Sequence, residues 1–121
     1  MIRDRVNKLV EWVQQGRILD AMHEFYAIDV QMQENQNAPT QGFEANLERE
    51  KQFVASIAEI HECRAVETMI DGNKAVIHWI LDFTSTSGEH VRLDQLALQD
   101  WHDGKIVNER FVYDTAGVKV A

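Results

Sequence analysis

The sequence has little of several features that define whole classes of proteins. Its 121 residues include one cysteine, Cys63, and one proline, Pro39. A lone cysteine cannot form an internal disulfide, which excludes a disulfide-stapled scaffold and favours a reducing, cytoplasmic setting. No stretch approaches the ~20 apolar residues of a membrane-spanning helix, and no apolar core of a secretory signal follows Met1. We therefore expect no membrane insertion.

Basic residues and ligand-binding motifs are also scarce. Twelve Lys and Arg stand against 20 Asp and Glu, which gives a formal net charge of −8. An acidic chain without a basic cluster is a poor binder of nucleic acid. A glycine-rich phosphate loop is absent, and His61-Glu62-Cys63 lacks the spacing of a metal site. The sequence predicts no nucleic acid partner, no metal and no cofactor.

Hydrophobic residues make up 45% of the chain, enough for the core of one domain over residues 1–121. Their periodicity predicts helices over residues 2–13, 18–26 and 43–58, a strand over 29–34, and four strands over 63–70, 74–83, 91–102 and 105–113. Asp71-Gly72 and Asp103-Gly104 are typical of two-residue hairpin turns. Helices grouped before a run of antiparallel strands indicate an α+β fold.

A two-residue turn at Asp103-Gly104 also predicts which side chains share a face of the sheet. One face would carry Asp94, Leu96, Leu98, Glu109, Phe111 and Tyr113. The other would carry Gln95, Ala97, Gln99, Trp101, Asn108, Arg110 and Val112. The first set mixes acidic and apolar groups, as a pocket does, and the second lacks acids, as the core of a homodimer interface does. A slip of one residue in either strand would exchange its faces.

Carboxylates among apolar side chains are the candidates for catalysis. Burial raises the pKa of a carboxyl, so Glu34 and Glu109 could exchange protons near neutral pH. The alternative is a hydrogen-bonded carboxylate at the edge of the sheet. The residues expected to line the pocket and bind a ligand are Tyr26, His78, Asp94, Phe111 and Tyr113. On the third helix, Asn46 and Glu50 either reach the mouth of this pocket or form an exposed pair.

Three stretches carry a family resemblance: residues 25–30, 39–42 and, most specifically, 103–114. Over nearly its whole length the chain resembles the SnoaL-like branch of the nuclear transport factor 2-like superfamily. The resemblance implies a cone-shaped, curved antiparallel sheet covered by three N-terminal helices, a pocket between them, and a dimer through the outer sheet face. Members include isomerases, cyclases, dehydratases and non-catalytic modules, so it implies a fold better than a function.

Within that resemblance, Glu34 takes the place of the general base of ketosteroid isomerases. The donors of their oxyanion hole fall on Leu9 and on Leu96 or Ala97, which cannot donate, and Phe111 replaces the aspartate of limonene epoxide hydrolases. Neither of those mechanisms is expected. We expect a cofactor-independent isomerase, cyclase or dehydratase that transfers a proton on a small, mostly apolar, neutral or cationic molecule. The alternative is a non-catalytic module that binds a ligand or a protein in the same cavity.

Overall fold

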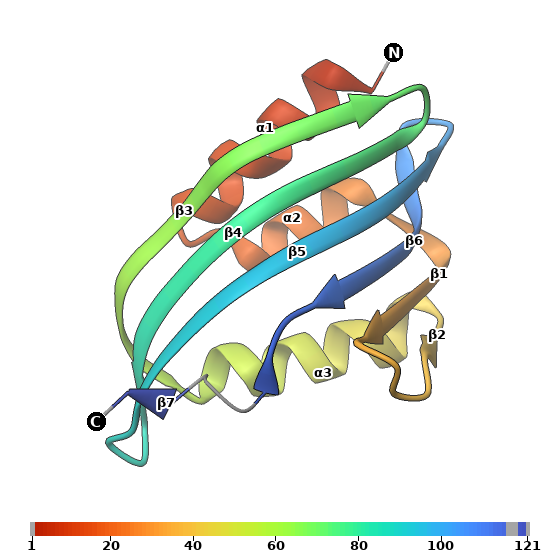
Figure 1. The fold of residues 1–121 in the computed structure, drawn as a ribbon. Coiled ribbons are helices and arrows are strands. Elements are labelled where there is room, and N and C mark those ends of the chain that lie inside the picture. The colour runs from red at the N-terminus through yellow and green to blue at the C-terminus, as the bar shows by residue number, and fades with distance from the viewer. Residues whose placement is uncertain (1, 116–118, 121) are drawn as a thin grey trace.

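Three helices pack on one face of a curved sheet in the computed structural model, which describes residues 2–115 and 119–120 (Figure 1). The elements are α1 (Arg3–Gln14), α2 (Ile18–Phe25), β1 (Tyr26–Glu34), β2 (Thr40–Gln41), α3 (Phe43–Ala55), β3 (Ile57–Asp71), β4 (Lys74–Ser85), β5 (His90–His102), β6 (Lys105–Val112) and β7 (Lys119–Val120). The predicted α+β order is confirmed, with β2 and β7 as short additions. None of the helices described is long and apolar enough to cross a membrane.

The sheet has seven strands in the order β2-β1-β6-β5-β4-β3, and β7 pairs with β5. Every pair is antiparallel except β1 with β6, which is parallel. The sheet is therefore mixed, where the sequence predicted an antiparallel one. The reason lies at α2, which ends beside the β5–β6 turn, so that Tyr26 at the start of β1 pairs with Ile106 at the start of β6.

The core lies between the helices and the concave face of the sheet. Each helix buries one stripe of side chains, as its apolar spacing requires. The buried apolar residues of the helices are Val6, Leu9, Ala21, Met22, Phe25 and Leu47, and the sheet adds Val30, Met32, Ala75, Ile77, Trp79, Ala97, Trp101 and Ile106. The guanidinium of Arg5 fixes this packing by donating to the carbonyl oxygens of Gly104 and Glu24, at 3.0 and 2.9 Å.

The two hairpin turns differ in how well the sequence predicts them. Asp103 and Gly104 both have positive φ, 50° and 77°, and His102 pairs with Lys105, which confirms the predicted turn. The other hairpin is centred one residue later than predicted, because Asp71 already pairs with Lys74.

A β-bulge in β6 overturns the predicted faces. Trp101 pairs with Ile106 but Asp100 pairs with Asn108, so Val107 is an extra residue on β6. From there on the register is shifted by one, and Glu109 lies opposite Gln99 instead of Leu98. The side chains of β5 that face the helices are therefore Gln95, Ala97, Gln99 and Trp101, and those on the outer face are Asp94, Leu96 and Leu98. The prediction of which β5 side chains face the pocket and which face outward was therefore wrong.

The third helix is shorter and the following strand longer than predicted. The helix ends at Ala55, where the Ser56 hydroxyl donates to the Phe53 carbonyl oxygen at 2.6 Å. β3 begins at Ile57 instead of Cys63 and contains three register shifts against β4. These irregularities interrupt the alternation of apolar and polar residues from which a strand is predicted.

The shifted register predicts losses of stability of very different size for two substitutions on β5. Trp101 is 3% exposed and packs edge-on against Phe25, whereas Leu96 is 39% exposed on the outer face. Trp101→Ala should lower the free energy of unfolding by about 3–5 kcal/mol, and Leu96→Ala by less than about 1 kcal/mol. Urea unfolding measures both. A larger loss for Leu96→Ala than for Trp101→Ala would contradict the register.

Candidate functional site

A buried carboxyl group lies where the concave face of β6 meets β1 and β5. Glu109 is 1% exposed. Its Oε1 accepts a short hydrogen bond from the Tyr26 hydroxyl, and its Oε2 accepts one from Nε2 of Gln99 at 2.7 Å. The Gln99 Oε1 accepts in turn from the indole nitrogen of Trp101 at 3.0 Å. The bulge in β6 makes this chain possible, because it brings Gln99 opposite Glu109.

Burial changes the proton affinity of these groups. It raises the pKa of Glu109 to about 7, although the hydrogen bonds from Tyr26 and Gln99 act in the opposite direction. Burial, together with the adjacent Glu109, raises the pKa of Tyr26 well above its usual value. Tyr26 thus stays a neutral donor near neutral pH, while Glu109 can gain or lose a proton there.

A second carboxyl group belongs to the same cavity. Burial, followed by repulsion from Glu109 and Glu34, raises the pKa of Glu50 to about 7. Glu50 lies on α3, and no hydrogen bond or ion pair joins its side chain to any residue that the structure describes. Glu109 therefore favours the protonated form of Glu50.

Two adjoining cavities lead to these carboxyls. The first, about 100 Å³, is lined by apolar side chains of α1, α2 and β4, together with Tyr26, Glu50, Cys63, Gln99 and Glu109. The second, about 140 Å³, is more polar, and its lining includes Glu34, Asn46, Arg49, Glu50 and Tyr113. Residues that line both are Met32, Glu50, Phe53, Leu81, Gln95 and Phe111. The site is thus one hollow with an apolar end and a polar end.

Glu34 lies at the polar end, where both of its carboxylate oxygens are engaged. Arg49 forms an ion pair with Oε2 at 2.5 Å, and the Tyr113 hydroxyl donates to Oε1 at 2.7 Å. Burial and the bond to Glu34 raise the pKa of Tyr113 to about 12. Glu34 is therefore a paired carboxylate at the mouth of the cavity, with both oxygens already engaged.

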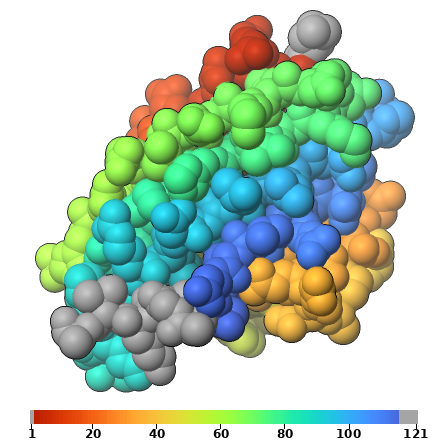
Figure 2. All heavy atoms as spheres, in the orientation of Figure 1, coloured from red at the N-terminus to blue at the C-terminus, as the bar shows by residue number. Residues whose placement is uncertain are grey.

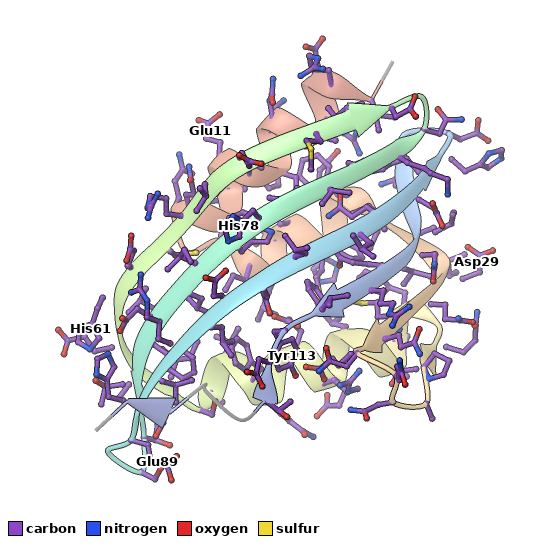
Figure 3. All side chains as sticks on the ribbon, viewed as in Figure 1. Glu11, Asp29, His61, His78, Glu89 and Tyr113 are labelled. Atoms are coloured by element: carbon purple, nitrogen blue, oxygen red, sulfur yellow. The ribbon has the colours of Figure 1, made fainter. Side chains whose placement is uncertain are left out.

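Two of the predicted ligand-binding residues lie on the other side of the sheet. His78 lies on the outer face, away from the helices (Figure 3). It is joined to Asp94 by a 2.6 Å contact. Their expected place in the pocket followed from the register that the bulge overturns, so that prediction was wrong. The structure does bring Tyr26, Glu109 and Phe111 to the apolar cavity and Glu34, Phe111 and Tyr113 to the polar one.

Sequence reasoning gave too little weight to Glu50 and placed Gln99 on the wrong face. The signal for Glu50 was present, because it stands one helical turn after the buried Asn46 and so faces the same way. Gln99 could not be found without the bulge. No group of three or more metal-ligating side chains that could hold an ion occurs among residues 2–115.

The match to a family model covers residues 1–113 and is to the SnoaL-like domain. The chain belongs to the SnoaL-like family. Its sequence matches none of the curated proteins compared with it.

Solved structures agree with this assignment. A candidate SnoaL-like polyketide cyclase from Mesorhizobium loti is 25% identical, with a TM-score of 0.79 over 92% of this chain and 97% of that one. A nuclear transport factor 2-like protein from Burkholderia pseudomallei is 17% identical, with a TM-score of 0.79 over 94% and 91%. A candidate isomerase from Rhodopseudomonas palustris is 15% identical, with a TM-score of 0.78 over 98% and 93%. The last two likenesses show the fold alone.

The raised pKa of Glu109 predicts a specific pH dependence of stability. A carboxyl with a higher pKa in the folded state stabilises the fold while protonated, and this contribution is lost as pH rises from about 4.5 to about 7. The difference in unfolding free energy between wild type and Glu109→Gln should change by up to about 3 kcal/mol across that window, in favour of the variant at high pH. Urea unfolding at pH 5 and pH 8 measures it.

The matched control is Glu48→Gln, which removes an exposed carboxylate from α3. Its difference from wild type should stay the same at both pH values. A constant difference for Glu109→Gln as well would contradict the raised pKa.

Proposed function

We propose that this protein is a cofactor-independent catalyst of proton transfer on a small, mostly apolar molecule, with Glu109 as the group that carries the proton. The observation that supports this most is the buried Glu109 carboxyl in the wall of a cavity, hydrogen-bonded to Tyr26, with a pKa of about 7. A general acid–base group works best when its pKa lies near the operating pH. The reaction class is isomerisation, cyclisation or dehydration.

The proton follows a simple path in this proposal. Ionised Glu109 takes a proton from an activated carbon of the bound molecule, and the electron pair of that C–H bond moves onto the neighbouring acceptor group. The protonated Glu109 then returns the proton to another atom, so the protein ends unchanged. Tyr26, a neutral donor, holds Glu109 in position throughout. The apolar walls exclude water and strengthen each of these electrostatic interactions.

The second candidate is a non-catalytic module that binds a small molecule in the same cavity. It is favoured by the fact that both oxygens of Glu109 already accept hydrogen bonds, from Tyr26 and Gln99. A buried polar group needs such partners for stability alone. The two candidates differ in whether Glu109 exchanges its proton with a bound molecule.

We also propose that two copies associate through the outer face of the sheet, the face that Figure 2 shows. The partly exposed apolar side chains there are Val66, Met69, Leu96 and Val112, at 36–57% exposure. Leu96 and Val112 pair with each other across β5 and β6, on the side of β6 that also carries Asn108 and Arg110 of the predicted interface. The other predicted interface residues, Gln95, Ala97, Gln99 and Trp101, face the helices instead. The cytoplasmic location stays a prediction, and the free Cys63 is compatible with it.

Deuterium exchange tests the catalytic proposal without knowledge of the natural substrate. The probe is 2-tetralone in D₂O, an apolar ketone with activated C–H bonds, and the rate of exchange is read by NMR. Wild type should accelerate exchange, and Glu109→Gln should lower the protein-dependent rate by about 10²-fold or more. Glu34→Gln should lower it by less than about tenfold, because Glu34 is held by Arg49 and Tyr113.

Glu48→Gln is again the control and should keep the wild-type rate. A wild-type rate no higher than that of Glu109→Gln would contradict proton transfer and favour the binding module.

Sedimentation velocity tests the association. Wild type should sediment as a dimer at micromolar concentration, and Leu96→Glu should give a folded monomer, because a charge in the apolar centre of an interface is costly. Glu48→Gln, on the exposed side of α3 and so on the opposite side of the sheet from this face, should leave the dimer intact. A monomeric wild type would overturn the proposal.

A further inference from the structure

Asn46, which lines the polar cavity, carries a buried hydrogen-bond acceptor that has no donor among the described residues. Asn46 is 2% exposed, and its Nδ2 donates to the carbonyl oxygens of Gly42 and Thr40 at 2.8 and 3.0 Å. These bonds fix the orientation of the amide. Its Oδ1 is buried with no partner among the residues that the structure describes. Such an orphaned acceptor costs about 1–3 kcal/mol, which a bound donor would offset.

Glu50 provides a second free acceptor beside it. The two residues are one helical turn apart on α3 and therefore face the same way, and both line the polar cavity. Glu50 also reaches the apolar cavity, where its carboxyl lacks a donor from the described residues. A ligand group placed here would meet the acceptors of Asn46 and Glu50. No described side chain would compete with it by donating to Glu50.

Acidic side chains outnumber basic ones in the lining around Asn46 and Glu50. Carboxyls come from β1, α3 and β6, as Glu34, Glu50 and Glu109, and the one basic side chain described in the lining is Arg49. Arg49 is already engaged by Glu34 and by the Thr40 hydroxyl, at 2.5 and 3.1 Å. The other titratable groups in the lining are Tyr26, Cys63 and Tyr113, which are neutral when protonated. The ionised hollow therefore carries a surplus of negative charge, enclosed by apolar walls.

We propose that the molecule bound at the site of the proposed function carries a protonated amine, which donates to Glu50 and to Oδ1 of Asn46 while its hydrocarbon part fills the apolar cavity. An ammonium group has three donors and no acceptor, which matches this lining. The inference rests on the proposed function, because it describes the substrate of the same cavity.

A bound ammonium would also separate the roles of the two carboxyls. Their pKa values are both about 7. A cation beside Glu50 lowers the pKa of Glu50, so that Glu50 stays ionised while Glu109 can still gain or lose a proton near pH 7. When their environments give two carboxyls different pKa values in this way, the difference decides which carboxyl carries the proton. Glu50 would then hold the substrate and Glu109 would transfer the proton.

Calorimetric titration with benzylamine and with benzyl alcohol tests this inference, since the two probes share a ring and differ in charge. At pH 8 wild type should bind benzylamine at least about tenfold more tightly than the alcohol. Lowering the pH to 6 should weaken benzylamine binding by about tenfold, because protons then compete for the carboxyls, and should leave the alcohol unchanged.

Glu50→Gln should lose the preference for the amine, and Glu48→Gln, on the same helix but exposed, should keep it. Because the pH arm uses wild type alone, it decides the question even where Glu50→Gln does not fold. Equal affinity for the two probes, a preference that is unchanged in Glu50→Gln, or no benzylamine binding at millimolar concentration would each overturn the inference. The exchange of 2-tetralone protons is measured without any amine, so the proposed function stands or falls separately.

Discussion

The extra residue in β6 at Val107 is the constraint on which the rest of the site depends. It shifts the pairing of β5 and β6 by one, so that Gln99 and Trp101 face the helices and Gln99 meets Glu109. Hydrogen-bond donors lower the cost of burying a carboxyl. With Tyr26 on one oxygen and Gln99 on the other, Glu109 can remain in the core of the sheet. Bulges are common next to functional sites because they change the direction in which a side chain points.

The polar and apolar parts of the hollow follow from the elements that build it. Helices α1 and α2 contribute hydrocarbon, whereas α3 contributes Asn46, Arg49 and Glu50 on the face that turns toward β1 and β6. Asn46 also holds the chain between β1 and α3 by its bonds to Thr40 and Gly42. One helix therefore fixes the loop at the mouth and supplies the second carboxyl. The family accounts for the fold, and these side chains give this member its chemistry.

Much of the fold could be predicted from the sequence, because it depends on local patterns. Helical spacing of apolar residues located the three helices, and Asp103-Gly104 located its hairpin to the residue. The bulge has no local signature, since Val107 is an ordinary strand residue, and so the faces of β5 were exchanged and His78 and Asp94 were placed in the pocket. Glu109, Tyr26, Phe111 and Tyr113 do line the cavities, and their roles there stay predictions. The pairing of Glu34 with Arg49 depends on contact between β1 and α3, which no sequence spacing encodes.

The protonation of Glu109 in the folded protein is the most direct test of this account. Carbon-13 NMR of side-chain carboxyl groups, with glutamate labelled at Cδ and Glu109 assigned through Glu109→Gln, follows each glutamate during a pH titration. The account predicts that the Glu109 signal titrates near pH 7 in the ligand-free protein, well above the ordinary range of a glutamate, which lies near 4.5. A Glu109 signal that titrates in the ordinary range would contradict it, because the carboxylate would then be too weak a base to take a proton from carbon efficiently near neutral pH.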